Sequence, residues 1–131
     1  MIFTDTSFWV ALHDRRDDRH EGAVKLLREH DGGQLVISDH VQGETWTTLR
    51  ARAGQRAAVG FLDAVASSER VRVVFVSEAL ETQAFEWLRA HGERPYSFVD
   101  ATSFALMRSL GVGRALTFDS DFAVAGFVIA S

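Results

Sequence analysis

Short apolar runs alternate with amphipathic segments along the whole chain, and this pattern predicts its secondary structure. The apolar runs are rich in β-branched and aromatic residues, which is typical of buried strands, and they cover residues 2–5, 35–38, 71–76, 115–118 and 127–129. Between them, apolar side chains recur at helical spacing and indicate helices near residues 8–13, 19–30, 40–52, 57–66, 78–91 and 98–110. Strands that alternate with helices predict an α/β fold, with a central parallel sheet of about five strands flanked by helices on both faces.

Polar residues at the ends of these segments predict how the helices begin. Thr6 or Ser7 is expected to cap the first helix, Asp39 the third and Ser77 the fifth, because short oxygen-bearing side chains satisfy the unpaired N–H groups of a first helical turn. Residues 119–125 carry two Asp residues and a Ser and are expected to form a turn before the last strand.

Length and composition indicate one ordinary domain with a buried core. The chain has 131 residues, of which 47% are hydrophobic, and we expect a single domain over residues 1–131. It contains no Cys, which excludes disulfides and thiolate zinc sites. The beginning of the chain lacks the basic front and cleavage site of a signal peptide, and no apolar run approaches membrane-spanning length. We therefore expect a cytoplasmic protein that has no contact with a membrane.

Four acidic residues stand out because each lies where an apolar strand or helix begins or ends. They are Asp5, Glu44, Asp100 and Asp119. Groups at the carboxyl ends of parallel strands, and in the first turns of the helices that follow, meet at one edge of the sheet. Carboxylates that are brought together beside apolar segments repel each other unless a cation lies between them. The pattern therefore predicts a metal site, with Asp121 either a fifth ligand or only a turn residue.

Each of these acids also has a purely structural explanation. Asp5 and Asp100 could cap helices, Glu44 could be an exposed helical residue, and Asp119 could belong to an ordinary turn. An Arg of the same chain built into the midst of the four carboxylates would argue against a metal site. If they do bind an ion, oxygen ligands favour Mg²⁺ or Mn²⁺. Zinc is disfavoured because the five His residues form no HxxH or HxxxH pair.

The charge of the chain is −4, which by itself argues against binding to nucleic acid. The distribution matters more than the total, because every basic residue except Lys25 is Arg, the better bidentate phosphate ligand. The candidates for phosphate contacts, weighed against simple solvation, are Arg15, Arg16, Arg50 and Arg52. Trp9 and Trp46 lie near the acids in sequence and either stack on an unpaired base or pack in the core.

Four segments carry a resemblance to a known family: DTS near the N-terminus, SDHVQGETW, YSFVDATSFALMRSLGV and ALTFDSDF. In this order they resemble the PIN-domain ribonucleases and, more narrowly, the VapC toxins of bacterial toxin–antitoxin pairs. The resemblance implies a PIN-like fold and an endoribonuclease that depends on Mg²⁺ or Mn²⁺. It implies the catalytic residues Asp5, Glu44, Asp100 and Asp119. The expected metal ligands are Asp5, Asp100, Asp119 and Asp121, and the expected supporting hydroxyls belong to Thr6, Ser7, Thr102 and Ser103.

The same resemblance implies a substrate and partners. A toxin of this kind is expected to cleave structured RNA and so inhibit translation, with the sarcin–ricin loop of 23S rRNA favoured and tRNA anticodon loops next. It implies a cognate VapB-type antitoxin and a homodimer. The alternative is a catalytically idle PIN-like module that only binds RNA or protein. Receiver domains and haloacid dehalogenase-type phosphatases are disfavoured, because both need a late Lys and the only Lys is Lys25.

Overall fold

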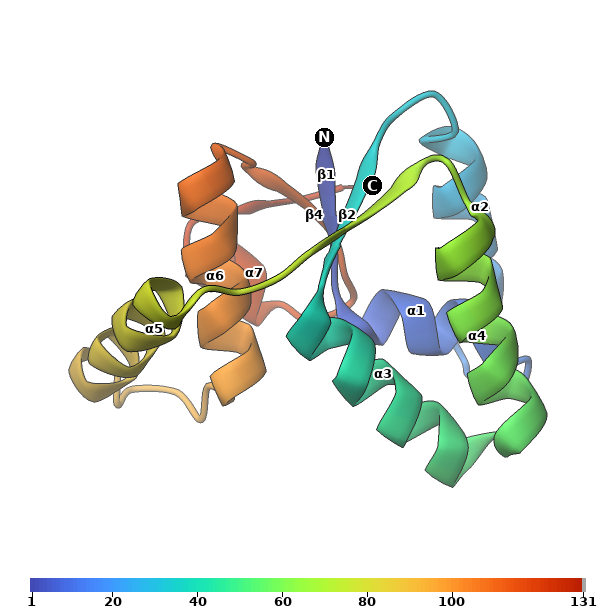
Figure 1. The fold of residues 1–131 in the computed structure, drawn as a ribbon, viewed down its shortest axis with the longest axis horizontal. Coiled ribbons are helices and arrows are strands. Elements are labelled where there is room, and N and C mark those ends of the chain that lie inside the picture. The colour runs from blue at the N-terminus through green and yellow to red at the C-terminus, as the bar shows by residue number, and fades with distance from the viewer. Residues whose placement is uncertain (131) are drawn as a thin grey trace.

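Five short parallel strands form one sheet in the order β3-β2-β1-β4-β5 in the computed structural model, which describes residues 1–130 (Figure 1). The strands are β1 (Ile2–Thr4), β2 (Leu35–Ser38), β3 (Val71–Val74), β4 (Arg114–Leu116) and β5 (Val128–Ile129). Every neighbouring pair is parallel, as the alternation of strands and helices predicts. Because β1 is central, the residue that follows it lies in the middle of the carboxyl edge of the sheet.

Helices cover both faces of this sheet, as predicted, with α1 to α4 on one side and α5 to α7 on the other (Figure 1). Their bounds are α1 (Thr6–His13), α2 (His20–Glu29), α3 (Asp39–Arg52), α4 (Gln55–Ser67), α5 (Glu78–Ala90), α6 (Phe98–Leu110) and α7 (Asp121–Val124). The predicted turn at 119–125 thus contains a short helix, α7. The longest of these helices, α3, has 14 residues. Within residues 1–130, no helix has the length and apolar character needed to cross a membrane.

Two of the predicted helix caps lie one or two positions after the observed ones. Asp5, rather than Thr6 or Ser7, is the N-cap of α1, and Ser38, rather than Asp39, is the N-cap of α3. Asp5 is the single extended residue between β1 and α1, and Ser38 is the last residue of β2. The apolar pattern does not resolve this boundary, because the strand runs directly into the helix without an intervening loop.

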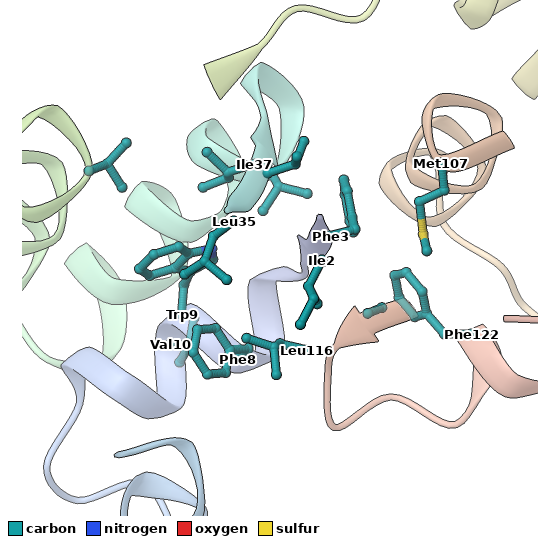
Figure 2. Close-up of a cluster of buried hydrophobic side chains, with 14 of the residues drawn as sticks. Ile2, Phe3, Phe8, Trp9, Val10, Leu35, Ile37, Met107, Leu116 and Phe122 are labelled. Carbon is teal, nitrogen blue, oxygen red and sulfur yellow. The ribbon is translucent and has the colours of Figure 1, made fainter. Parts of the chain in front are cut away.

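The core lies on both faces of β1, because successive strand residues point to opposite sides of the sheet. Phe3 faces α6 and α7, where its ring stacks on Phe122 with 6.3 Å between the ring centroids (Figure 2). Thr4 faces α1 and accepts a hydrogen bond of 2.7 Å from the indole N–H of Trp9. Trp9 is only 3% exposed, so it is a core residue and does not stack on a base.

Candidate active site

The four acids that the sequence singles out converge at the carboxyl edge of the sheet. Asp5 directly follows β1, and Asp119 follows β4 after two residues. Asp100 lies in the first turn of α6, and Glu44 lies in the second turn of α3. All four line one pocket of about 670 Å³. The structure therefore gathers carboxylates from four elements, although they span most of the chain.

Asp5 is the most buried of these carboxylates, with 5% of the residue exposed. Its Oδ2 accepts hydrogen bonds of 2.9 Å from the hydroxyl groups of Ser7 and Thr117. Burial raises the pKa of Asp5, and the hydrogen bonds from Thr117 and Ser7 oppose that effect by favouring the charged form. The side chain is thus held in one orientation at the floor of the pocket while it also caps α1.

Thr117 was not predicted as part of the site, and it connects two of the acids. Its Oγ1 donates to Asp5 and accepts a hydrogen bond of 3.0 Å from the backbone N–H of Asp119. Ser7, which was predicted, accepts a bond of 2.9 Å from the N–H of Phe118. A hydroxyl residue two positions before the last acid is the only signal for Thr117 in the sequence. These bonds hold the turn that carries Asp119 against the end of β1.

Asp100 combines a structural role with a position in the pocket. It forms a capping box with Ser97, because its Oδ2 accepts from the Ser97 N–H and its own N–H donates to the Ser97 hydroxyl, both over 3.0 Å. Burial raises the pKa of Asp100 to about 6, and the negative charges of Asp5 and Asp119 add to the effect. Capping and membership of the acidic site are therefore not alternatives, either here or at Asp5.

The donor set fits a hard divalent cation. One carboxylate oxygen from each of Asp100, Asp119 and Asp121 lies within 4.8 Å of the others. Oxygen ligands on opposite sides of a Mg²⁺ ion, each about 2.1 Å from the metal, are about 4 Å apart, so this spacing is compatible with a shared ion. Asp5 lies near enough for its charge to raise the pKa of Asp100. A cation between the two carboxylates would relieve their mutual repulsion.

One residue that sequence reasoning missed contacts this group of acids. Nη2 of Arg94 lies 2.5 Å from Oδ1 of Asp121, and Nε donates to the same oxygen over 2.8 Å. Nothing in the spacing of the two residues signals this pair, because the loop after α5 brings them together. The other ion pairs in residues 1–130 are Lys25–Glu29 and His40–Glu81. Across this described part of the chain, no Arg is paired with any of the four carboxylates.

Of the four predicted supporting hydroxyl residues, Thr6 and Ser7 line the pocket, whereas Thr102 and Ser103 do not. Thr102 is buried and its hydroxyl donates to the carbonyl of Val99 over 3.0 Å. Ser103 is fully buried in α6. Thr102 lies about 200° round the helix from Asp100, whereas Ser103 lies nearer its face but is enclosed in the core.

The predicted arginines separate into three groups. Arg16 and Arg52 line the acidic pocket, together with Arg19, which was not predicted. Arg15 lines a neighbouring pocket of about 450 Å³ that also contains Arg16. Arg50 is exposed on α3 and lines neither pocket. The acidic pocket therefore has a partly basic rim, in which further acids also take part; they are Asp14, Asp17 and Asp18.

Comparisons with known proteins agree on one family. The family model described as PIN domain matches residues 2–128. The "23S rRNA-specific endonuclease VapC20" of Mycobacterium tuberculosis, curated from two strains, is 54% identical over 128 residues, which cover 98% of this chain and 96% of the relative.

Solved structures give the same result. The crystal structure of Mycobacterium tuberculosis VapC20, described as a sarcin–ricin loop cleaving toxin, matches with a TM-score of 0.90 and 52% identity, over 98% of this chain and 97% of the other. VapBC2 from Rickettsia felis, solved with a promoter DNA fragment, matches with a TM-score of 0.69 over the same shares but at 18% identity, which shows the fold alone. The chain belongs to the PIN domain family and, within it, to the VapC group.

Proposed function

We propose that this protein is a metal-dependent endoribonuclease, the toxin of a type II toxin–antitoxin system, and that it cleaves the sarcin–ricin loop of 23S rRNA. The observation that carries the proposal is the convergence of Asp5, Glu44, Asp100 and Asp119 on one pocket. The identity of 54% with an endonuclease named as 23S rRNA-specific supports the substrate. Cleavage of that loop would stop translation, and a ribosomal substrate would require the protein to act in the cytoplasm.

Asp5, Asp100 and Asp119 are the residues that would hold the ion, Mg²⁺ or Mn²⁺, since hard oxygen ligands suit both. Asp121 is a further candidate ligand by position, but it is engaged by Arg94. When bound, such an ion acts as a Lewis acid on a phosphoryl oxygen and makes a water molecule more acidic. The raised pKa of Asp100 means that protons and a divalent ion compete for this carboxylate in the acidic range.

The chain's own groups position the substrate and move the proton. Ser7 and Thr117 hold the Asp5 carboxylate in one orientation. Glu44 faces the same pocket from α3, and within residues 1–130 its carboxylate makes no hydrogen bond, so it is available to orient or deprotonate water at the scissile phosphate. Arg16 and Arg52 line the pocket, where they would bind substrate phosphates and so offset the negative charge of the acids.

The proposed partners follow from the VapC relationship. A VapB-type antitoxin would bind this chain and block the acidic pocket, and the active toxin would be a homodimer. Co-expression with the small reading frame next to the toxin gene, followed by affinity purification, tests the first expectation. Light scattering on the purified toxin tests the second, and a mass of 14.5 kDa in solution would contradict it.

The nuclease assignment is tested by cleavage of an RNA hairpin that carries the sarcin–ricin loop. We expect cleavage with Mg²⁺ or Mn²⁺ and none with a chelator. Asp5→Asn and Asp100→Asn should each lower the rate by at least about 100-fold, because each removes a charged ligand. Glu86→Gln, an exposed acid on α5, is the matched control and should leave the rate unchanged. Full cleavage by both Asp variants would contradict the mechanism.

Two alternatives give different results in the same experiments. A catalytically idle PIN-like module would bind RNA but would neither cut it nor arrest growth when it is expressed. A toxin directed at tRNA would cut anticodon loops, so mapping new 5′ ends across total RNA after induction separates the two RNA targets. The intact acidic quartet favours turnover over simple binding.

A further inference from the structure

The ion pair between Arg94 and Asp121 carries an inference that rests on the proposed nuclease function. The Asp121 carboxylate has an oxygen within 4.8 Å of carboxylate oxygens of Asp100 and Asp119. Nε and Nη2 of Arg94 both contact Oδ1 of the same carboxylate, over 2.8 Å and 2.5 Å. A guanidinium group of this chain therefore stands at the edge of the acidic pocket.

Asp121 can serve either as a ligand of the ion or as the anchor of Arg94. Only 16% of its side chain is exposed, so its charge needs a nearby partner. The guanidinium supplies that partner at every working pH, because Arg does not lose its proton in proteins. One hydrogen bond and one ion-pair contact to the same oxygen hold the arginine in place, and Asp121 lies outside the set of residues that line the pocket.

Arg94 keeps donors for a further contact. A guanidinium has five N–H groups, and the hydrogen bond to Asp121 uses that of Nε, while Nη2 is in ion-pair contact with the same oxygen. In the described chain, Nη1 makes no hydrogen bond, and 38% of the side chain is exposed to solvent. The group thus resembles a pre-oriented phosphate contact, since Arg binds phosphate oxygens through paired N–H groups.

We propose that Asp121 holds Arg94 so that its guanidinium contacts an RNA phosphate beside the acidic pocket, and that Asp121 is not a ligand of the ion. Arg94 is then a substrate-contact residue and Asp121 a positioning residue. Arg94 lies in the loop between α5 and α6, whereas Arg16 and Arg52 lie in the loop after α1 and in α3. The RNA backbone would therefore meet cations from separate parts of the fold as it passes the carboxylates.

The first test measures RNA binding without turnover. The probe is a fluorescein-labelled hairpin with the sarcin–ricin loop sequence, the background is Asp5→Asn, and the readout is Kd by anisotropy over a range of salt. Arg94→Ala should weaken binding roughly three- to tenfold and lower the slope of log Kd against log salt by about 0.7, as expected for one lost phosphate contact. Arg94→Lys should keep most of the slope, because the charge remains.

Asp121→Asn should shift Kd in the same direction as Arg94→Ala but by less. The double variant should bind no worse than Arg94→Ala alone, because the two residues act as one unit. Arg89→Ala, an exposed Arg on α5, is the matched control and should change neither Kd nor slope. Thermal unfolding of each variant checks that it is folded. If Arg94→Ala does not fold, the comparison of Arg94→Lys with Asp121→Asn still tests whether the charge and its orientation contribute to RNA binding.

The second test measures Mn²⁺ binding to the protein alone, by electron paramagnetic resonance of the free ion. We expect Asp121→Asn to leave Mn²⁺ affinity within about twofold of the wild type, because in this proposal its carboxylate is paired with Arg94 and does not bind the ion. Asp100→Asn should weaken it tenfold or more. Asp121→Asn weakening Mn²⁺ binding as much as Asp100→Asn would overturn the proposal, and so would an Arg94→Ala variant with unchanged RNA affinity and salt slope. Failure of the wild type to cut RNA would instead overturn the nuclease function itself.

Discussion

The hydroxyl group of Thr117 donates a hydrogen bond of 2.9 Å to the carboxylate of Asp5, although 112 residues separate the two in the chain. The bond joins the segments that follow β1 and β4, which are neighbours in the sheet. Because Thr117 also accepts the backbone N–H of Asp119, one hydroxyl links the carboxylate of Asp5 to the backbone that carries Asp119. The hydrogen bonds between the segments that follow β1 and β4 therefore help to position the acidic site, in addition to the helices.

We predict that Thr117→Val lowers the cleavage rate by about 10- to 100-fold, the range found when a partner that orients a metal ligand is removed. Val has the shape of Thr but cannot donate to Asp5. The buried Asp5 carboxylate then lacks one of its hydrogen bonds, and the free energy of unfolding should fall by about 1–3 kcal/mol. Thr117→Ser keeps the hydroxyl and should retain most activity. Equal activity of the Val and Ser variants would show that the bond has no catalytic importance.

The acidic pocket should make the metal-free protein less stable as the pH rises. Burial, followed by the charges of Asp5 and Asp119, raises the pKa of Asp100 from 3.8 to about 6. Between these values the folded state binds more protons than the unfolded state. The stabilisation is thus fully present below pH 3.8 and is lost as the pH rises through 6. Discounted for partial solvent exposure, the loss is about 1–2 kcal/mol.

Thermal unfolding in chelator at pH 5 and pH 7.5 measures this effect by comparing the wild type with Asp100→Asn. The difference in Tm between the two proteins should be larger at pH 7.5, where the wild-type carboxylate is charged. Adding Mg²⁺ or Mn²⁺ at pH 7.5 should raise the Tm of the wild type, because ligands that bind only the folded state stabilise it. A pH dependence identical in the two proteins would rule out Asp100 as its source.

The two arginines near the end of α3 should differ in how much they contribute to RNA binding. Arg52 lines the acidic pocket and Arg50 does not, although both are exposed. We expect Arg52→Ala to raise KM for the hairpin several-fold and to lower its salt dependence, because one phosphate contact is lost. Arg50→Ala should have a smaller effect. Arg114→Ala, at the start of β4 and so at the opposite edge of the sheet, serves as the control for net charge.

Trp9 should matter for stability and not for RNA binding. Its indole N–H donates to Thr4 over 2.7 Å inside the core, and Thr4 in turn donates to the carbonyl of Val36. Trp9→Phe should lower the free energy of unfolding by about 1–3 kcal/mol, through the lost bond and a partly filled cavity. Denaturant unfolding measures the change. A loss of RNA affinity at unchanged stability would instead indicate a contact between Trp9 and a base.

Much of this protein is determined by patterns that lie close together in the chain. Short apolar runs specify the strands, and the segments between them, with apolar residues at helical spacing, specify the helices. A parallel sheet covered on both faces is the arrangement that buries such runs. Four acids at the ends of these runs were enough to predict the residues of the pocket, because the carboxyl ends of parallel strands share one edge. The family resemblance, and not local chemistry, implied that Ser7 would support the site.

Only the tertiary structure decided which other groups reach that edge. Thr117 belongs to the site because β1 and β4 are neighbours, and strand order is not visible in the spacing of residues. Thr102 and Ser103 do not line the pocket, because the packing of α6 encloses both in the core. Arg94 meets Asp121 through a loop whose path depends on how α5 packs against α6. Periodicity determines which face of an element is buried, but contacts between distant loops depend on the packing of the whole chain.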